Sequence, residues 1–86
     1  MKWKKIGKTI TPECETIIYQ PEISPVLNSE LAITIERRKK HIPHAQGKSG
    51  TWDHTTYFVL KQGKEIIEKY TLKDAKEEAE RIIEET

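Results

Sequence analysis

The last part of the chain carries the pattern that most restricts the fold: an amphipathic helix that directly follows a hairpin. Thr71 and Asp74 are spaced as a capping box, in which a hydroxyl and a carboxylate three residues later satisfy N–H groups at a helix start. Apolar residues then recur at steps of three or four, which places them on one helical face: Leu72, Ala75, Ala79, Ile82 and Ile83. The pattern predicts a helix over residues 72–84 that buries this face.

A β-hairpin is predicted immediately before the helix. Residues 56–61 are rich in β-branched and aromatic side chains, and residues 65–70 resume the same composition. Gln62 and Gly63 lie between them and supply the turn. The hairpin and the helix that follows it therefore predict a sheet covered by a helix.

Two further strands are expected upstream, and a third if residues 4–10 also pair. Residues 31–37 alternate cleanly between apolar and polar side chains, residues 15–19 form the next strand, and residues 4–10 show a weaker strand pattern. Residues 20–30 contain two prolines and no period, so they are predicted to be a connection. Residues 41–54 are predicted to be a second, long connection.

Together these elements predict an α+β fold. It is an antiparallel sheet of four strands, or five if residues 4–10 also pair, with one C-terminal helix packed on one face. A chain of 86 residues is expected to form one small domain, residues 1–86. The hydrophobic fraction is 35% and the charged fraction 34%, so one modest core leaves little apolar surface for a deep pocket. This composition argues against an enzyme.

The termini and the cysteine content predict a cytoplasmic protein that does not enter a membrane. The basic start of the chain is followed by no apolar segment of the kind that a secretory leader contains. The longest uninterrupted apolar run, residues 57–60, is far shorter than the roughly 20 residues of a membrane span. Cys14 is the only cysteine and can form no internal disulfide, which suits a reducing compartment.

Residues capable of catalysis are poorly placed for it. Cys14 lies between Glu13 and Glu15, and these carboxylates oppose formation of the thiolate that a nucleophile needs. Asp53 and His54 are adjacent in an extended segment, so their side chains are expected to point to opposite faces. The sequence therefore predicts no catalytic residues and no enzyme.

The histidines offer donors for a metal ion, but their spacing does not favour a site. His41, His44 and His54 could join Cys14 as zinc ligands. Structural zinc sites bring two close pairs of ligands, and here Pro43 interrupts the single close pair. We predict no metal and no cofactor, and leave open whether the histidines act together.

A run of four cations is the strongest functional signal. Arg37, Arg38, Lys39 and Lys40 follow a strand that is expected to end near Arg37, so that their side chains fan out at the mouth of the 41–54 loop. Residues 1–64 contain 11 Lys and Arg against 6 Asp and Glu, whereas residues 65–86 contain 4 against 8. Phosphate is attracted to the basic part of the chain and not to its acidic end.

These residues predict a nucleic-acid-binding module, with DNA and RNA both open. The candidate binding residues are Arg37, Arg38, Lys39, Lys40, Lys48 and Trp52, where the tryptophan would stack on a base. A different explanation for the run of cations is that charges at strand ends and edges deter aggregation. The alternative function is a protein-interaction or homodimerising module that uses an open sheet face or edge.

The segment "TYFVLKQGKEIIEKYTLKDAKEEAERI", residues 56–82, resembles the strand-turn-strand-helix unit of the three-stranded-sheet DNA-binding domains of tyrosine recombinases from mobile elements. The chain as a whole also resembles, in its composition, small accessory proteins of bacterial mobile elements. The resemblance implies that strands 56–61 and 65–70 face the major groove of DNA. Glu65 and Glu68 depart from this pattern, because they stand where phosphate contact requires basic residues.

Overall fold

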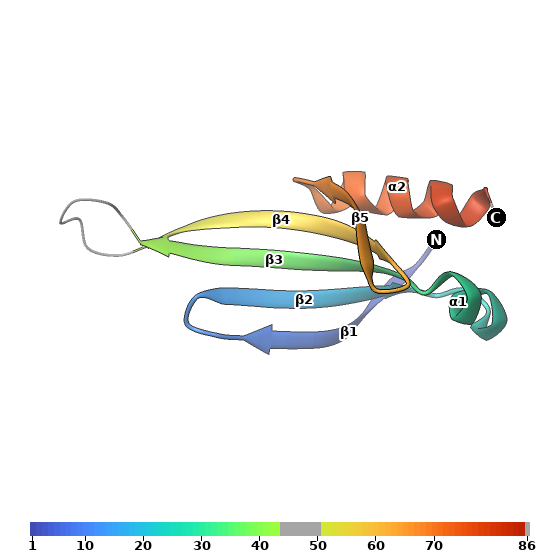
Figure 1. The fold of residues 1–86 in the computed structure, drawn as a ribbon, viewed down its shortest axis with the longest axis horizontal. Coiled ribbons are helices and arrows are strands. Elements are labelled where there is room, and N and C mark those ends of the chain that lie inside the picture. Colours follow the sequence, from blue (N-terminus) through green and yellow to red (C-terminus); the bar gives the residue numbers. More distant parts are fainter. Residues whose placement is uncertain (44–50, 86) are drawn as a thin grey trace.

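The described residues form one antiparallel sheet with two helices. The computed structural model describes residues 1–43 and 51–85, and for Pro43, Thr51 and Trp52 it describes the backbone alone. Each strand pairs with its neighbour in sequence, in the order β1-β2-β3-β4-β5 (Figure 1). The elements are β1 (Trp3–Ile10), β2 (Cys14–Pro21), α1 (Pro25–Leu31), β3 (Ile33–Pro43), β4 (Thr51–Lys61), β5 (Lys64–Lys69) and α2 (Leu72–Glu84). The predicted α+β class, with a C-terminal helix on an antiparallel sheet, is confirmed.

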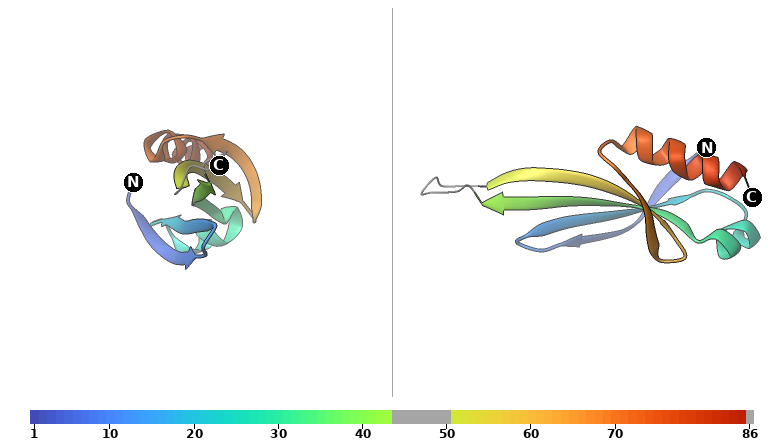
Figure 2. Two further views of the ribbon diagram at one scale, coloured as in Figure 1. Left: turned by 90° about the vertical axis from the view of Figure 1, so that its left-hand side faces the viewer. Right: turned by 45° about the horizontal axis from the view of Figure 1, so that its top comes forward.

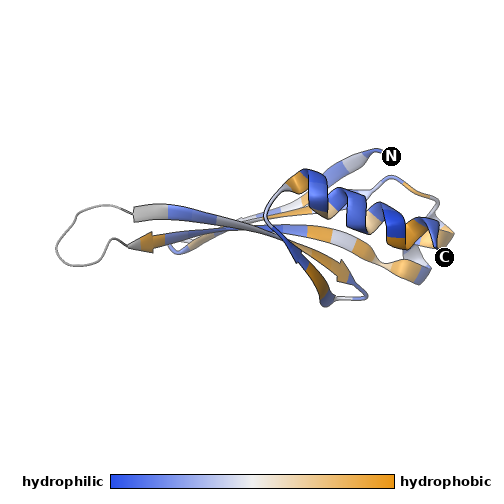
Figure 3. Ribbon diagram, turned by 90° about the horizontal axis from the view of Figure 1, so that it is seen from above, coloured by the Kyte–Doolittle hydropathy of each residue, from blue (hydrophilic) through white to orange (hydrophobic). Residues whose placement is uncertain are grey.

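The core lies between α2 and one face of the central strands. Ile33, Ile35 and Val59 are fully buried on that face, and Ala75 and Ala79 of α2 are fully buried against it. The small alanine side chains allow the helix to approach the strands closely. Seen from above, the outward side of α2 is mostly hydrophilic (Figure 3). The amphipathic pattern of residues 72–84 therefore acts as predicted.

Local signals at both ends of the C-terminal hairpin are also confirmed. Gln62 and Gly63 have φ values of 52° and 80°, and a tight hairpin turn requires positive φ at both central residues. At the start of α2, the Thr71 hydroxyl accepts a hydrogen bond of 3.1 Å from the backbone N–H of Asp74. The turn and the N-cap therefore set the boundaries of β5 and α2.

The prediction that residues 20–30 form only a connection is wrong, because they contain α1. Ser24 caps this helix by accepting a hydrogen bond of 3.2 Å from the Leu27 N–H, and Pro25 occupies its first turn. Leu31, expected to begin a strand, instead ends α1 and remains buried in the core. Ala32 then takes a left-handed conformation with φ 45°, which reverses the chain into β3.

The predicted limits of the central hairpin are also wrong. β3 was expected to end near Arg37 but continues to Pro43, and β4 begins at Thr51 and not at residue 56. The ladder between them runs without a shift from Ile33↔Lys61 to Pro43↔Thr51. Residues 44–50 of the expected 41–54 loop lie outside the described residues. The result is a long central hairpin of β3 and β4, which β2 flanks as far as Lys40, in a molecule with extents of 52 × 21 × 20 Å (Figure 1).

Candidate nucleic-acid interface

The four consecutive cations lie within β3, not at a loop mouth. Arg37 is opposite Tyr57 of β4, and Lys40 is opposite His54. We call residues 37–43 of β3 and 51–57 of β4 the basic ribbon. Figure 2 shows it projecting, with the β1–β2 hairpin beside it, from the half of the sheet that α2 covers. The expected fan of cations at the end of a strand is therefore replaced by cations along a paired strand.

Strand alternation divides these cations between the two faces of the ribbon. Arg37 and Lys39 share the face of Ile33 and Ile35, which α2 covers further along the sheet. Arg38 and Lys40 point to the opposite face, which α2 does not cover. The basic run therefore places positive charge on both faces.

Arg38 is held by carboxylates from two other positions in the sheet. Its Nη2 donates a 2.8 Å hydrogen bond to Glu36 and a second hydrogen bond to Glu65 of β5. Its guanidinium carbon lies 4.2 Å from the centre of the Phe58 ring. The hydrogen bond with Glu36, and then that with Glu65, raise the pKa of Arg38 above its ordinary value. Arg38 thus ties β3 to β5 across β4.

Lys39 and His41 share one carboxylate on the other face. Asp53 Oδ2 lies 3.4 Å from Lys39 Nζ, and Asp53 Oδ1 lies 2.7 Å from His41 Nδ1. The hydrogen bond from His41, and then that from Lys39, hold the pKa of Asp53 below its usual range. An ionised carboxylate only accepts, so Nδ1 carries the proton of this hydrogen bond. Asp53 therefore partly neutralises this side of the ribbon.

Arg37 and Lys40 are differently placed. Within residues 1–43 and 51–85, neither has a carboxylate at ion-pair distance. Lys40 is exposed, whereas Arg37 is half-buried and its Nε lacks a hydrogen-bond partner among the described atoms. These two residues are the cations of the ribbon that can meet an external anion without first breaking an ion pair.

Two of the predicted binding residues fall wholly or partly outside the described part of the chain. Lys48 lies outside the described residues, and so does the side chain of Trp52. The backbone of Trp52 pairs with Ile42 within the ribbon. Their part in binding stays a prediction.

The lysines of the N-terminal strand are not brought to the ribbon, because β1 pairs with β2 and not with β3. Lys4 and Lys5 are opposite Gln20 and Tyr19, and Tyr19 in turn is opposite Ile35, which places these lysines beside the core. Lys8 is level with Arg37 through Ile17, but its Nζ lies 3.7 Å from a carboxylate oxygen of Glu15.

The histidines that the structure describes are separated by the sheet. His41 lies on the face of Asp53, while His54 lies on the opposite face, where its ring meets Tyr70 edge-on at 6.4 Å. His44 is outside the described residues. In the part of the chain that the structure describes, no three His, Cys, Asp or Glu residues come together as a group that could hold a metal ion.

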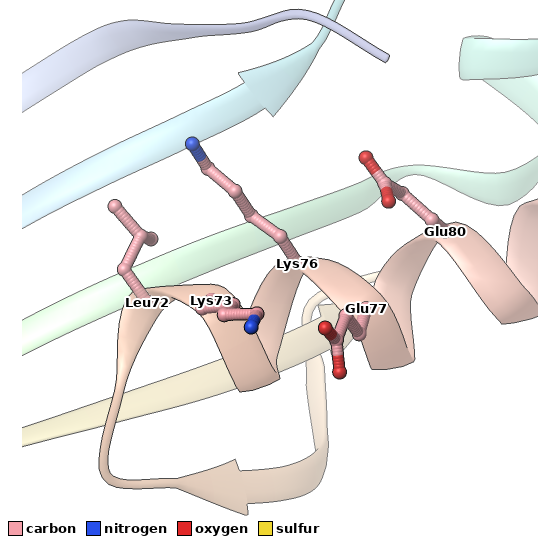
Figure 4. A pocket seen from close by; sticks show the side chains of 5 residues that line it. All are labelled: Leu72, Lys73, Lys76, Glu77 and Glu80. Atoms are coloured by element: carbon pink, nitrogen blue, oxygen red, sulfur yellow. The ribbon is translucent and has the colours of Figure 1, made fainter.

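A shallow depression of about 500 Å³ runs along α2 and is lined by residues of that helix, not by residues of the basic ribbon. Leu72, Lys76 and Glu80 project toward the strands, while Lys73 and Glu77 lie further round the helix (Figure 4). Glu80 is already engaged, because it accepts a 3.2 Å hydrogen bond from Trp3 Nε1. Two lysines and two glutamates give this depression no net charge.

The partners of the cations escaped prediction because they depend on strand pairing. Glu65 is 27 positions from Arg38, and Asp53 meets His41 only because β3 and β4 extend further than their apolar patterns.

The described helices include none that is long and apolar enough to cross a membrane. Comparison of the chain with protein-family models, with curated proteins and with solved structures found no match.

Proposed function

We propose that this protein is a non-enzymatic nucleic-acid-binding module that uses the basic ribbon as its ligand surface. The observation that carries the proposal is the pair Arg37 and Lys40, which stand on a projecting ribbon without carboxylate partners in the described part of the chain. Phosphate contacts supply most of the affinity of sequence-independent binding. Lys39 would add a contact if a phosphate displaced Asp53.

The test is a double variant, Arg37→Gln/Lys40→Gln, with binding of a labelled oligonucleotide followed by fluorescence anisotropy at several salt concentrations. Losing two phosphate contacts should lower affinity roughly tenfold or more at low salt and flatten the log–log salt slope by about 1.8. The matched control is Lys61→Gln/Lys64→Gln, which also removes two charges and breaks no ion pair among the described residues.

The control pair lies at the β4–β5 turn, at the far end of β4 from the ribbon. Its slope should therefore stay close to that of the unmodified protein. Equal losses in both double variants would show that net charge and not the ribbon governs binding. Absence of binding by the unmodified protein at low salt would end the proposal.

Removing the carboxylate of Asp53, which partly neutralises the ribbon, is expected to strengthen oligonucleotide binding. Asp53→Asn removes a negative charge and frees Lys39 and His41, so oligonucleotide affinity should rise several-fold and the salt slope steepen by about 0.9. Glu84→Gln, at the exposed end of α2, makes the same change in net charge far from the ribbon. Titration of both variants against one oligonucleotide makes the comparison, and equal gains would remove the ribbon from the explanation.

The alternative, a protein-interaction or homodimerising module, is favoured by the open edge of β1. Ile6 and Ile10 are exposed there, and β1 pairs on one side only. Lysines along β1 and a register shift between Lys5 and Gly7 oppose it, because both features hinder the addition of another strand. Light scattering over a range of protein concentrations tests it, and a constant monomer mass would count against it.

A further inference from the structure

Arg37 and Lys40, which have no carboxylate partner among the described residues, lie on opposite faces of the basic ribbon. Arg37 and Lys40 are three positions apart in β3, so strand alternation places one on each face. An extended rise of about 3.4 Å per residue separates them by about 10 Å along the strand. A ligand that touches a single face can reach only one of them, whereas a ligand with two phosphate chains can reach both.

The outer edge of β4 within the ribbon pairs with no described strand, although the ring of Tyr70 meets that of His54 there. β5 pairs with β4 only from Tyr57 to Lys61, so residues 51–56 have no strand on their outer side in the described part of the chain. On the other side, β2 pairs with β3 as far as Lys40. This β4 edge, which β5 does not cover, is therefore the edge that can enter a groove first, with the two faces of the ribbon on either side of it.

The dimensions select one kind of groove. Sheets stack about 10 Å apart, so a ribbon with side chains on both faces is about 10 Å thick. The major groove of B-form DNA is about 12 Å wide, whereas its minor groove is about 6 Å wide. The major groove of an RNA duplex is deep and too narrow for side chains to read.

Resting on the proposed function, we infer that the ligand is B-form duplex DNA and that the ribbon enters its major groove by the β4 edge that β5 does not cover. One phosphate backbone then faces Arg37 and the other faces Lys40. Single-stranded DNA offers one backbone and therefore engages one face. Duplex RNA excludes the ribbon from its major groove.

The first experiment compares three labelled ligands of one sequence: duplex DNA, duplex RNA and single-stranded DNA. Anisotropy titrations at matched salt should show duplex DNA bound tighter than either of the others by roughly tenfold or more, because only that ligand meets cations on both faces. Equal or tighter binding of the single strand or of the RNA duplex would overturn the inference.

The second experiment reverses one charge on each face, in Arg37→Glu and Lys40→Glu. Each variant should weaken duplex DNA binding and flatten its salt slope by about 0.9 or more, because each loses one phosphate contact. Single-stranded DNA should respond to one of the two variants only. Lys61→Glu makes the same charge change away from the ribbon and should leave the slope unchanged.

Thermal melting separates misfolded variants from variants that have lost binding. The pattern of binding separates failure of this inference from failure of the proposed function. Arg37 is half-buried, so Arg37→Gln is included and every variant is checked by its thermal melting. If duplex DNA binding responds to one face alone, the groove geometry is wrong while nucleic-acid binding stands. If no ligand binds, the proposed function fails together with the inference.

Discussion

Replacing Ile35 with alanine is expected to lower the free energy of unfolding by about 2–5 kcal/mol, the cost of removing a large buried aliphatic side chain. Ile35 is 0% exposed and lies in the cluster formed by β3, β4 and α2. The loss combines the transfer of the side chain from water with the cavity that remains when its neighbours relax only in part. The total free energy of unfolding of a domain is roughly 5–15 kcal/mol, so the substitution removes a large part of it.

The same substitution at Ile10 serves as the control, because that side chain is 66% exposed at the end of edge strand β1. Ile10→Ala should change stability by less than about 0.5 kcal/mol. Urea unfolding followed by circular dichroism measures both variants. Similar midpoints would mean that β3 does not contribute Ile35 to a core under α2.

The second large effect is expected from adding volume to the contact between helix and sheet. Ala79 of α2 is 0% exposed, so Ala79→Leu must displace either the helix or the strands and should cost about 1–3 kcal/mol. Glu77→Leu introduces the same side chain on the exposed side of α2. There it meets solvent, and stability should stay within about 0.5 kcal/mol.

Thermal unfolding of the two leucine variants separates close packing from helix propensity, which is the same for the introduced residue in both. If Ala79→Leu proved as stable as Glu77→Leu, the alanines would not be in contact with the sheet. The outcome also bears on function. A destabilised core that leaves the ribbon intact should change unfolding without changing the salt slope of oligonucleotide binding.

The elements governed by neighbouring residues were predictable. Helix 72–84 and the turn at Gln62 and Gly63 are specified by an N-cap, a helical period and positive φ, and each of these acts over a few positions. α1 carried comparable signals in Ser24 and Pro25. These signals do not predict a helix by themselves, because seven residues are too few to display a clear apolar period.

The lengths of β3 and β4 were not predictable from hydrophobic alternation. Alternation reports which face is buried, and burial under α2 ends near Ile35. The ladder continues to Pro43↔Thr51 because backbone hydrogen bonds between two strands do not require an apolar face. The basic residues consequently sit on a paired ribbon, not in a loop.

For the candidate site, too, the sequence was enough for one part of the prediction and strand pairing decided the other part. Composition and position were enough to single out Arg37, Arg38, Lys39 and Lys40 as concentrated positive charge. Which of these charges remains available was decided by strands that meet only in the folded sheet, where Glu65 and Asp53 reach their cations. Short-range rules act on residues close along the chain, whereas ion pairing across strands depends on register, and register is settled when the whole sheet assembles.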